Sequence, residues 1–157
     1  MSLHELDHIR KFLNPPTEDD IRRAFASENV KQFVLEADGA PAGLLLLTYI
    51  EDWLIEMRRI AVVRPGAGLG TFAIQWFFEH AFAERGAHRV YLEVAAANER
   101  ARRLYERLGF SYEGTARHGF RNHASGAYED LCGYGCLAMD VRVSRTAGNP
   151  QPCLRGR

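Results

Sequence analysis

A glycine-rich turn lies between a short apolar run and a long apolar segment. It reads Arg64-Pro-Gly-Ala-Gly-Leu-Gly-Thr71. A helix that begins at such a turn presents bare backbone N–H groups, which attract phosphate, and glycines let a phosphate approach closely. The turn therefore predicts an anion-binding site made by backbone atoms.

An amphipathic helix is predicted about thirty residues later, from Asn98 to the Gly109-Phe110 pair. Tyr105 shares one helical face with Ala101 and Leu108, so it serves either in core packing or in contact with a ligand. Asn98 either caps the helix or hydrogen-bonds a ligand. Together, the two segments favour an enzyme that binds a phosphate-bearing cofactor and uses a tyrosine beside it.

The glycine turn alone does not identify the cofactor. Its spacing is G-x-G-x-G, at Gly66, Gly68 and Gly70, and not the G-x-G-x-x-G of dinucleotide-binding folds. The turn also lacks the Gly-Lys-Ser/Thr of a P-loop, which excludes that class of nucleotide site. Taken by itself, the turn is equally compatible with a structural link between a strand and a helix.

Hydrophobic periodicity predicts the elements that position these residues. Strands are expected at 8–13, 31–37, 43–50, 54–63, 88–96, 110–114 and 128–141. Helices are expected after the N-cap Thr17, at 68–85 and at 98–108, with a polar loop at 118–126. The strand–helix–strand unit at 54–96 implies a parallel pair with a right-handed crossover, preceded by antiparallel strands.

The predicted fold class is therefore α/β with a mixed (α+β) sheet. The glycine turn then lies at the carboxyl end of a parallel strand, where open α/β sheets place ligands. We expect a single domain over residues 1–141. Residues 142–157 have no periodicity and are rich in Gly, Pro, Asn, Ser and Arg, which predicts a flexible C-terminal tail.

The composition limits the possible partners. Lys+Arg and Asp+Glu both number 20 among 157 residues, so the net charge is zero, which argues against a general nucleic-acid binder. No stretch resembles a signal peptide or is long enough to span a bilayer, so we expect a cytoplasmic protein with no membrane partner. Cys132 and Cys136 are too close along one strand for a disulfide and have too few neighbouring ligands for a metal, so we expect buried thiols.

The two chemical segments together resemble the GNAT superfamily of N-acetyltransferases, over nearly the whole chain without its tail. The strand Ile60-Ala-Val62 and the turn after it are similar to the acetyl-CoA strand and pyrophosphate loop of that family. The pattern Asn98-x-x-Ala101-x-x-x-Tyr105-x-x-x-Gly109-Phe110 resembles its later helix. Tyr128-x-Asp130 is similar to the branch that acetylates ribosomal-protein N-termini, and to relatives that acetylate small amines and amino acids.

The resemblance implies a GNAT-like twisted central sheet with flanking helices and acetyl-CoA as co-substrate. It implies direct acetyl transfer to a primary amine, either a protein N-terminus or a small amine, by a monomer or homodimer. Where the family usually has Arg or Gln, Pro65 stands here, with Arg64 beside it. The cofactor-binding residues that it implies are Ile60, Ala61, Val62, Arg64, Gly66, Ala67, Gly68, Leu69, Gly70, Thr71 and Asn98.

Three residues are candidates for proton transfer. A leaving thiolate that resembles cysteine has a pKa of about 8.5, so a tyrosine with a pKa of about 10 is a suitable donor, and Tyr105 is the candidate. Glu56 and Glu93 stand where similar enzymes carry a base, four residues before Ile60 and five before Asn98. The choice between the two glutamates stays open. For each, the alternative to a role as base is that it is simply an exposed strand residue.

Two other functions fit the same motifs. A non-catalytic acyl-CoA sensor would keep the cofactor site without turnover, and a nucleotide-binding regulator would prefer ATP or NAD to coenzyme A. One helix is expected between the first two strands, where many relatives have two, so an open acceptor site is predicted. His118 and His123 lie in the polar loop, either in contact with the acceptor or in solvent.

Overall fold

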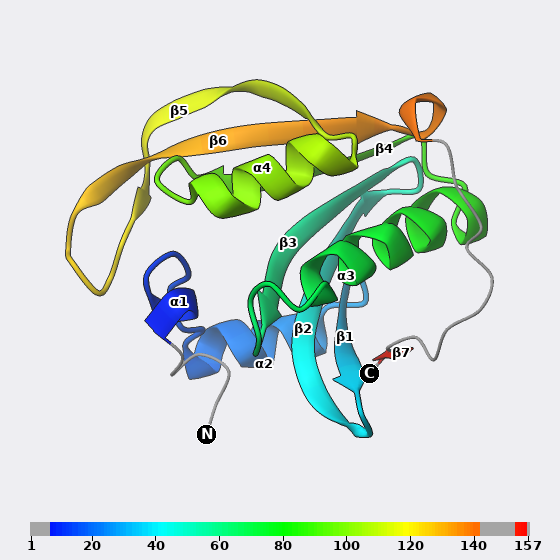
Figure 1. The fold of residues 1–157 in the computed structure, drawn as a ribbon, viewed down its shortest axis with the longest axis horizontal. Coiled ribbons are helices and arrows are strands. Elements are labelled where there is room, and N and C mark those ends of the chain that lie inside the picture. The colour runs from blue at the N-terminus through cyan, green and yellow to red at the C-terminus, as the bar shows by residue number, and fades with distance from the viewer. Residues whose placement is uncertain (1–6, 142–152, 157) are drawn as a thin grey trace.

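The computed structural model describes residues 7–141 and 153–156, which form one sheet with helices on both faces (Figure 1). Helices α3 and α4 cover the near face in Figure 1, and α2 lies against the far face. The helices are α1 (Asp7–Arg10), α2 (Glu18–Ala26), α3 (Leu69–Phe78), a π-helix (Glu79–Glu84), α4 (Glu99–Leu108) and a 3-10 turn (Ala138–Asp140). The strands are β1 (Val30–Ala37), β2 (Ala40–Glu51), β3 (Leu54–Val62), β4 (Arg89–Ala95), β5 (Ser111–Arg121), β6 (Tyr128–Leu137) and β7 (Cys153–Gly156).

The sheet runs in the order β5-β6-β4-β3-β2-β1-β7. β1, β2 and β3 are antiparallel neighbours, and β3 and β4 form a parallel pair joined through α3. β4, β6 and β5 continue the sheet with antiparallel pairing. The predicted mixed sheet, with antiparallel N-terminal strands and a central parallel pair, is confirmed.

The parallel pair is short. The register between β3 and β4 covers three residue pairs and ends at Glu56 opposite Tyr91, after which the strands separate. On its other side, β3 stays paired with β2 as far as Val62, with a bulge that leaves Arg58 as the extra residue. Because a bulge bends a strand and increases its twist, β3 turns away from β4 while β2 still holds it.

The N-terminal segment is helical, so the strand expected at 8–13 is wrong. The N–H of Leu13 donates to the carbonyl of Ile9 at 2.8 Å, and Ile9 is buried. Apolar residues four apart suit a helical turn better than a strand, in which they would need neighbours on the same face of a sheet. Asn14 then joins the segment to the β5–β6 loop, through hydrogen bonds with Arg121 and His123.

Two predicted helix starts are confirmed. Thr17 caps α2, because its hydroxyl accepts the N–H of Asp20 at 3.1 Å and the Asp20 carboxylate accepts the N–H of Thr17 at 2.9 Å. Gly68 precedes α3 with a φ of 78°. The helix expected at 68–85 is present, with its last part wound as the π-helix, and Gly86 follows with a φ of 67°.

Strand β5 extends into the region expected as a loop. It runs to Arg121, so the expected loop at 118–126 is too long, and the chain turns at 122–127 instead. β5 carries a bulge between Ala116 and Phe120, where His118 has a φ of 52°. The N–H of His118 donates to Asp130 Oδ1 at 2.9 Å, which holds the bulge against β6.

The end of the chain contributes an edge strand. β7 pairs antiparallel with β1, so Cys153–Gly156 is part of the sheet and not of a flexible tail. The rest of the expected tail, residues 142–152 and 157, lies outside the described residues. The strand expected at 128–141 ends at Leu137, followed by the 3-10 turn.

The main core lies between the sheet and the two long helices. Ile74 and Phe77 of α3 are fully buried, and the ring of Phe78 meets Phe110 at a centroid distance of 5.1 Å. Cys132 and Cys136 are buried free thiols, as expected. Among the described residues, no helix is long and apolar enough to cross a membrane.

An ion pair crosses β6 above Gly135. Arg89 of β4 donates two hydrogen bonds to the carboxylate of Glu113 on β5, at 2.6 and 2.5 Å. A Cβ at Gly135 would overlap both side chains, whereas the nearest atom to a Cβ at Gly133 would be 3.9 Å away. The glycine therefore provides the space in which the two charges meet.

We predict that Gly135→Ala displaces this ion pair and lowers the free energy of unfolding by about 0.5–1 kcal/mol at neutral pH, the range for partly exposed pairs. Gly133→Ala is the matched control on the same strand and should cost less. The Arg89 hydrogen bonds lower the pKa of Glu113 from 4.5, so its contribution is present above that value and is lost as the pH falls through the lowered pKa. Denaturant titrations at two pH values measure this, and an equal cost for both variants would contradict it.

Candidate active site

A cleft of about 1150 Å³ opens where β3 and β4 separate. Its walls come from β3, the end of β4, the glycine turn, α4 and α1. From Met57 to Val62, β3 has a strand partner on its β2 side but not on its β4 side. The backbone groups on the β4 side can therefore pair with an extended ligand, as a sheet edge pairs with a peptide.

The glycine turn forms one end of the cleft. Gly66 and Gly68 have φ values of 88° and 78°, in the region that non-glycine residues rarely adopt. Gly68 supplies no capping side chain, and the first turn of α3 contains no acidic residue. The N–H groups at the start of α3 are thus left for an anion.

Three arginines of α4 bring positive charge to the same end. Arg100, Arg103 and Arg107 all line the cleft, and their spacing of three and four residues places them on one helical face. The guanidinium of Arg100 would lie 3.6 Å from a Cβ placed at Gly66, and Arg107 donates to the hydroxyl of Thr71 at 3.5 Å. Sequence reasoning misses these arginines, although their helical spacing is a usable signal.

Most of the predicted cofactor residues line the cleft. They are Ile60, Ala61, Val62, Gly66, Gly68, Gly70, Thr71 and Asn98. Three predicted residues are not among the lining side chains. Arg64 forms an ion pair with Asp38 at 3.2 Å, Leu69 is buried in a small apolar cluster with Leu35, and Ala67 is exposed. The Arg64–Asp38 pair is exposed, so a cofactor contact by the Arg64 side chain stays a prediction.

Asn98 is an N-cap that also faces the cleft. Its Oδ1 accepts the N–H of Ala101 at 3.2 Å, which satisfies one free donor of α4. Its amide nitrogen donates to no residue in the part of the chain that the structure describes, and the residue lines the cleft. Asn98 can therefore cap α4 and also donate a hydrogen bond to a ligand.

Tyr105 is both a core residue and a cleft residue. It is 5% exposed, and its ring lies near Phe110 and Tyr134, with centroid distances of 5.8 and 6.2 Å. Its hydroxyl bonds to no described residue, yet the residue lines the cleft. Burial raises the pKa of Tyr105 above its ordinary value of 10. The hydroxyl therefore stays protonated at neutral pH and can serve as a proton donor.

Both candidate bases lie in the cleft. Glu56 is half-buried and Glu93 is exposed. Glu56 is opposite Tyr91 in the parallel register, and Glu93 is two residues further along β4, so the three side chains share one face of the sheet. The pKa of Tyr91 is raised by burial and then by both carboxylates. The structure thus brings the two glutamates to one place, on either side of Tyr91.

The cleft also contains residues that were not expected there. Arg58 and Arg59 line it, and the pKa of Arg59 is lowered by burial and by Arg58. α1 covers part of it, with His8 Nε2 at 2.9 Å from the carbonyl of Val62 and with Phe12 in its wall. The expectation of one helix before the second strand is wrong, because α1 and α2 both precede β1. The open acceptor site that was inferred from it stays a prediction.

Two other expectations concern the polar loop and metal binding. His118 lines a smaller neighbouring pocket, whereas His123 is exposed and its N–H donates to Asn14 Oδ1 at 2.8 Å. Within residues 7–141 and 153–156, no group of three or more His, Cys, Asp or Glu could hold a metal ion.

Comparison with known proteins gives a consistent result. Residues 2–110 match the model of the Acetyltransferase (GNAT) family. The chain is similar to spermidine N(1)-acetyltransferase of Escherichia coli (strain K12), with 30% identity over 131 residues, 75% of this chain and 70% of that protein. It is also similar to the putative ribosomal N-acetyltransferase YdaF of Bacillus subtilis (strain 168), with 32% identity over 130 residues, 77% of this chain and 67% of that protein.

A solved structure shares the fold. The spermidine N-acetyltransferase from Vibrio cholerae in complex with CoA and spermine superposes with a TM-score of 0.70 at 24% identity, covering 80% of this chain and 78% of that chain. At this level of identity the likeness concerns the fold alone.

Measurements of the free energy of unfolding can test whether the Tyr105 hydroxyl has a structural role. We predict that Tyr105→Phe changes the free energy of unfolding by less than about 0.5 kcal/mol, because no protein hydrogen bond is lost. Tyr134→Phe is the matched control. Its hydroxyl accepts from Arg102 at 3.0 Å and donates to Glu106 at 2.7 Å, so its loss should cost about 1–3 kcal/mol. If Tyr105→Phe is as destabilising as Tyr134→Phe in denaturant titrations, the Tyr105 hydroxyl has a structural role.

Proposed function

The chain belongs to the GNAT family of acetyltransferases, an N-acetyltransferase with acetyl-CoA as co-substrate, and we propose that it acts at the cleft between β3 and β4. One observation carries this proposal. The cleft combines an unpaired strand edge, a protonated tyrosine without a protein partner and two carboxylates. These are the groups that acetyl transfer to an amine requires.

The cofactor end of the cleft is cationic. Backbone N–H groups of Gly66 to Thr71 would hold the pyrophosphate, with Arg100 and Arg107 supplying charge. The free edge of β3 would pair with the amides of the pantetheine arm, and Asn98 can donate a further hydrogen bond. A backbone N–H near Ile60 or Ala61 would polarise the acetyl carbonyl.

The proposed reaction needs one base and one acid. Acetyl-CoA supplies an activated acyl thioester. The attacking amine must be neutral, and an alkylammonium with a pKa of about 10.4 costs roughly 4–5 kcal/mol to deprotonate at pH 7. Glu56 or Glu93 removes one proton from the ammonium, the new C–N bond forms as the C–S bond breaks, and Tyr105 gives a proton to the departing sulfur. The nitrogen then loses its second proton, which returns Tyr105 to its protonated form.

The acceptor is proposed to be a small alkylamine. The names of the relatives point to two kinds of acceptor, spermidine and a ribosomal protein. Glu56 and Glu93 place two carboxylates on the acceptor side of the cleft, beside Arg58 and Arg59, and a carboxylate can pair with an ammonium group. The α-amine of a protein N-terminus is the second candidate, because the same carboxylates suit it.

Three further expectations complete the proposal. We infer a cytoplasmic enzyme, since Cys132 and Cys136 are free thiols and burial raises the pKa of Cys136 to about 11, which keeps it inert. Residues 1–141 would form its single catalytic domain. A non-catalytic sensor is less well supported, because it would need neither the free Tyr105 hydroxyl nor the paired glutamates.

The direct test is release of free thiol from acetyl-CoA in the presence of alkylamines and N-terminal peptides. We predict turnover by the wild type, and a fall of roughly 10–10³-fold in kcat for Tyr105→Phe with little change in the Kd of acetyl-CoA. A contact that strengthens as charge develops on sulfur affects turnover and not binding. Because burial raises the pKa of Tyr105, the ratio of the two rates should be constant from about pH 7 to pH 9. Absence of turnover with every amine, despite acetyl-CoA binding, would favour the sensor.

The two glutamates can be separated by isosteric replacement. Glu56→Gln or Glu93→Gln should lower kcat/KM by about 10²-fold at neutral pH, with partial recovery at high pH, where the amine deprotonates itself. The recovery identifies lost base catalysis, since a packing defect would not be repaired by pH. Unchanged kinetics in both variants would mean that another group accepts the proton.

A further inference from the structure

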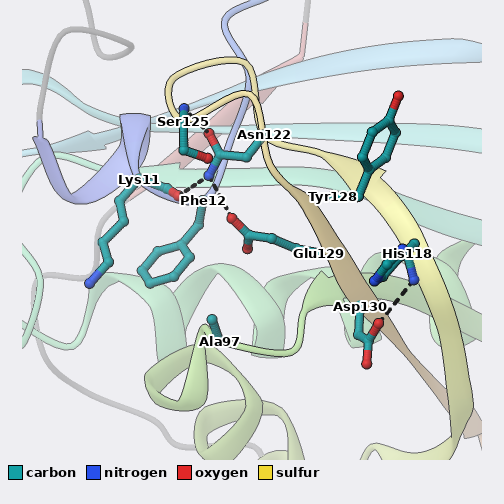
Figure 2. Close-up of a pocket in the computed structure, with 9 residues that line it drawn as sticks. All are labelled: Lys11, Phe12, Ala97, His118, Asn122, Ser125, Tyr128, Glu129 and Asp130. Carbon is teal, nitrogen blue, oxygen red and sulfur yellow. Dashed lines mark hydrogen bonds between the residues drawn. The ribbon is translucent and has the colours of Figure 1, made fainter.

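A second cavity, which we call the side pocket, lies beside the cleft. It has a volume of about 520 Å³ and is formed by the turn after α1, the end of β4, the β5 bulge and the start of β6 (Figure 2). Phe12 and Ala97 line both cavities. A molecule on the acceptor side of the cleft can therefore extend into the side pocket.

The buried residue Asn122 organises this pocket. It is 6% exposed, and its Nδ2 donates to the carbonyl of Lys11 at 3.0 Å and to Glu129 Oε1 at 2.9 Å. Its Oδ1 accepts the N–H groups of Ala124 and Ser125. One amide thus fixes the loop, the N-terminal segment and the direction of the Glu129 carboxylate.

Glu129 is a half-buried carboxylate with unused bonding capacity. Its Oε2 bonds to no residue in the described part of the chain, and Glu129 forms no ion pair there. The cation of the pocket itself, Lys11, lies over the ring of Phe12 at 5.2 Å from the centroid. Figure 2 shows the Glu129 carboxylate between Phe12 and Asp130.

Asp130, the other carboxylate of the side pocket, is already used by the fold. It accepts the N–H of His118 and so holds the β5 bulge. A cation that enters the pocket therefore meets two carboxylates, and of these Glu129 lies on the face of the sheet that carries Leu131 and Glu93.

The sheet links Glu129 to the reaction site. Glu93 is opposite Gly133 in the β4–β6 register, and Glu129 lies four residues before Gly133 on β6, on the same face. At 3.2–3.4 Å per residue, the two backbone positions are roughly 13 Å apart. Leu131 lies between them and lines the cleft. The order along the sheet is carboxylate, apolar side chain, carboxylate, which suits an alkyl chain with a cation at each end.

We propose that the side pocket binds a second cationic group of the acceptor, so that the acceptor is a diamine or longer polyamine whose distal ammonium pairs with Glu129. The proposal rests on the proposed function in one respect, because it places the reacting amine at Glu56 and Glu93. An alkyl chain gains by burying apolar surface against Phe12 and Leu131, while its ammonium keeps a charged hydrogen-bond partner.

Binding can be measured without turnover. Protein saturated with coenzyme A, which carries no acetyl group, is titrated calorimetrically with α,ω-diaminoalkanes of increasing length and with the 1-aminoalkanes of equal length. A diamine of matching length should bind about 10-fold more tightly than its monoamine, equivalent to about 1.4 kcal/mol. Glu129→Gln should remove this preference and leave the affinity for monoamines unchanged. Glu51→Gln, which removes the same charge from the exposed end of β2, should keep it.

Two results would overturn the proposal. One is equal affinity for diamines and monoamines in the wild type, and the other is a preference that survives in Glu129→Gln. Tighter binding of an N-terminal peptide, independent of Glu129, would also overturn it and point to a protein acceptor. A preference that depends on Glu129, together with no acetyl transfer to any amine, would instead remove the proposed function and leave the side pocket as a polycation site.

Discussion

The separation of β3 from β4 after three paired residues is the feature on which the site depends. A parallel strand in the middle of a sheet is normally hydrogen-bonded to a strand on each side. Beyond Glu56, β3 has lost β4 as a neighbour, so its backbone N–H and C=O groups on that side have no strand partner. The bulge at Arg58 and the continued pairing with β2 keep β3 separated from β4. The cleft and the access to Tyr105 follow from this divergence, while the last paired residues, Glu56 and Tyr91, place Glu56 on the same face as Glu93.

The two ends of the cleft differ in their charged groups. At the glycine turn, arginines of α4 and the N-terminus of α3 make a positive environment for an anionic cofactor. The other end carries the carboxylates of Glu56, Glu93 and, in the side pocket, Glu129, together with the cations Arg58, Arg59 and Lys11. Tyr105 also lines the cleft, and burial raises its pKa, so it stays protonated. In the proposed reaction the cationic end would bind the anionic acetyl donor, although the whole chain has no excess charge.

Local sequence patterns predict the parts of this site that depend on backbone conformation. Gly66 and Gly68 adopt left-handed φ values, Thr17 and Asn98 cap helices, and the apolar run before the turn forms a strand. Long-range contacts explain what sequence reasoning misses. α1 forms where a strand was expected, and the bulge in β5 depends on the carboxylate of Asp130. β7 depends on an edge of β1 that becomes available only in the folded sheet.

Hydrogen–deuterium exchange of the β3 amides, with and without acetyl-CoA, tests the central claim most directly. Amides between Met57 and Val62 that are not bonded to β2 should exchange more slowly when acetyl-CoA is bound, together with those in the first turn of α3. Amides of Leu54–Glu56, already paired with β4, should change little. Binding of acetyl-CoA that leaves exchange in β3 unchanged, with protection elsewhere in the chain, would contradict the assignment of the cleft as the acetyl-transfer site.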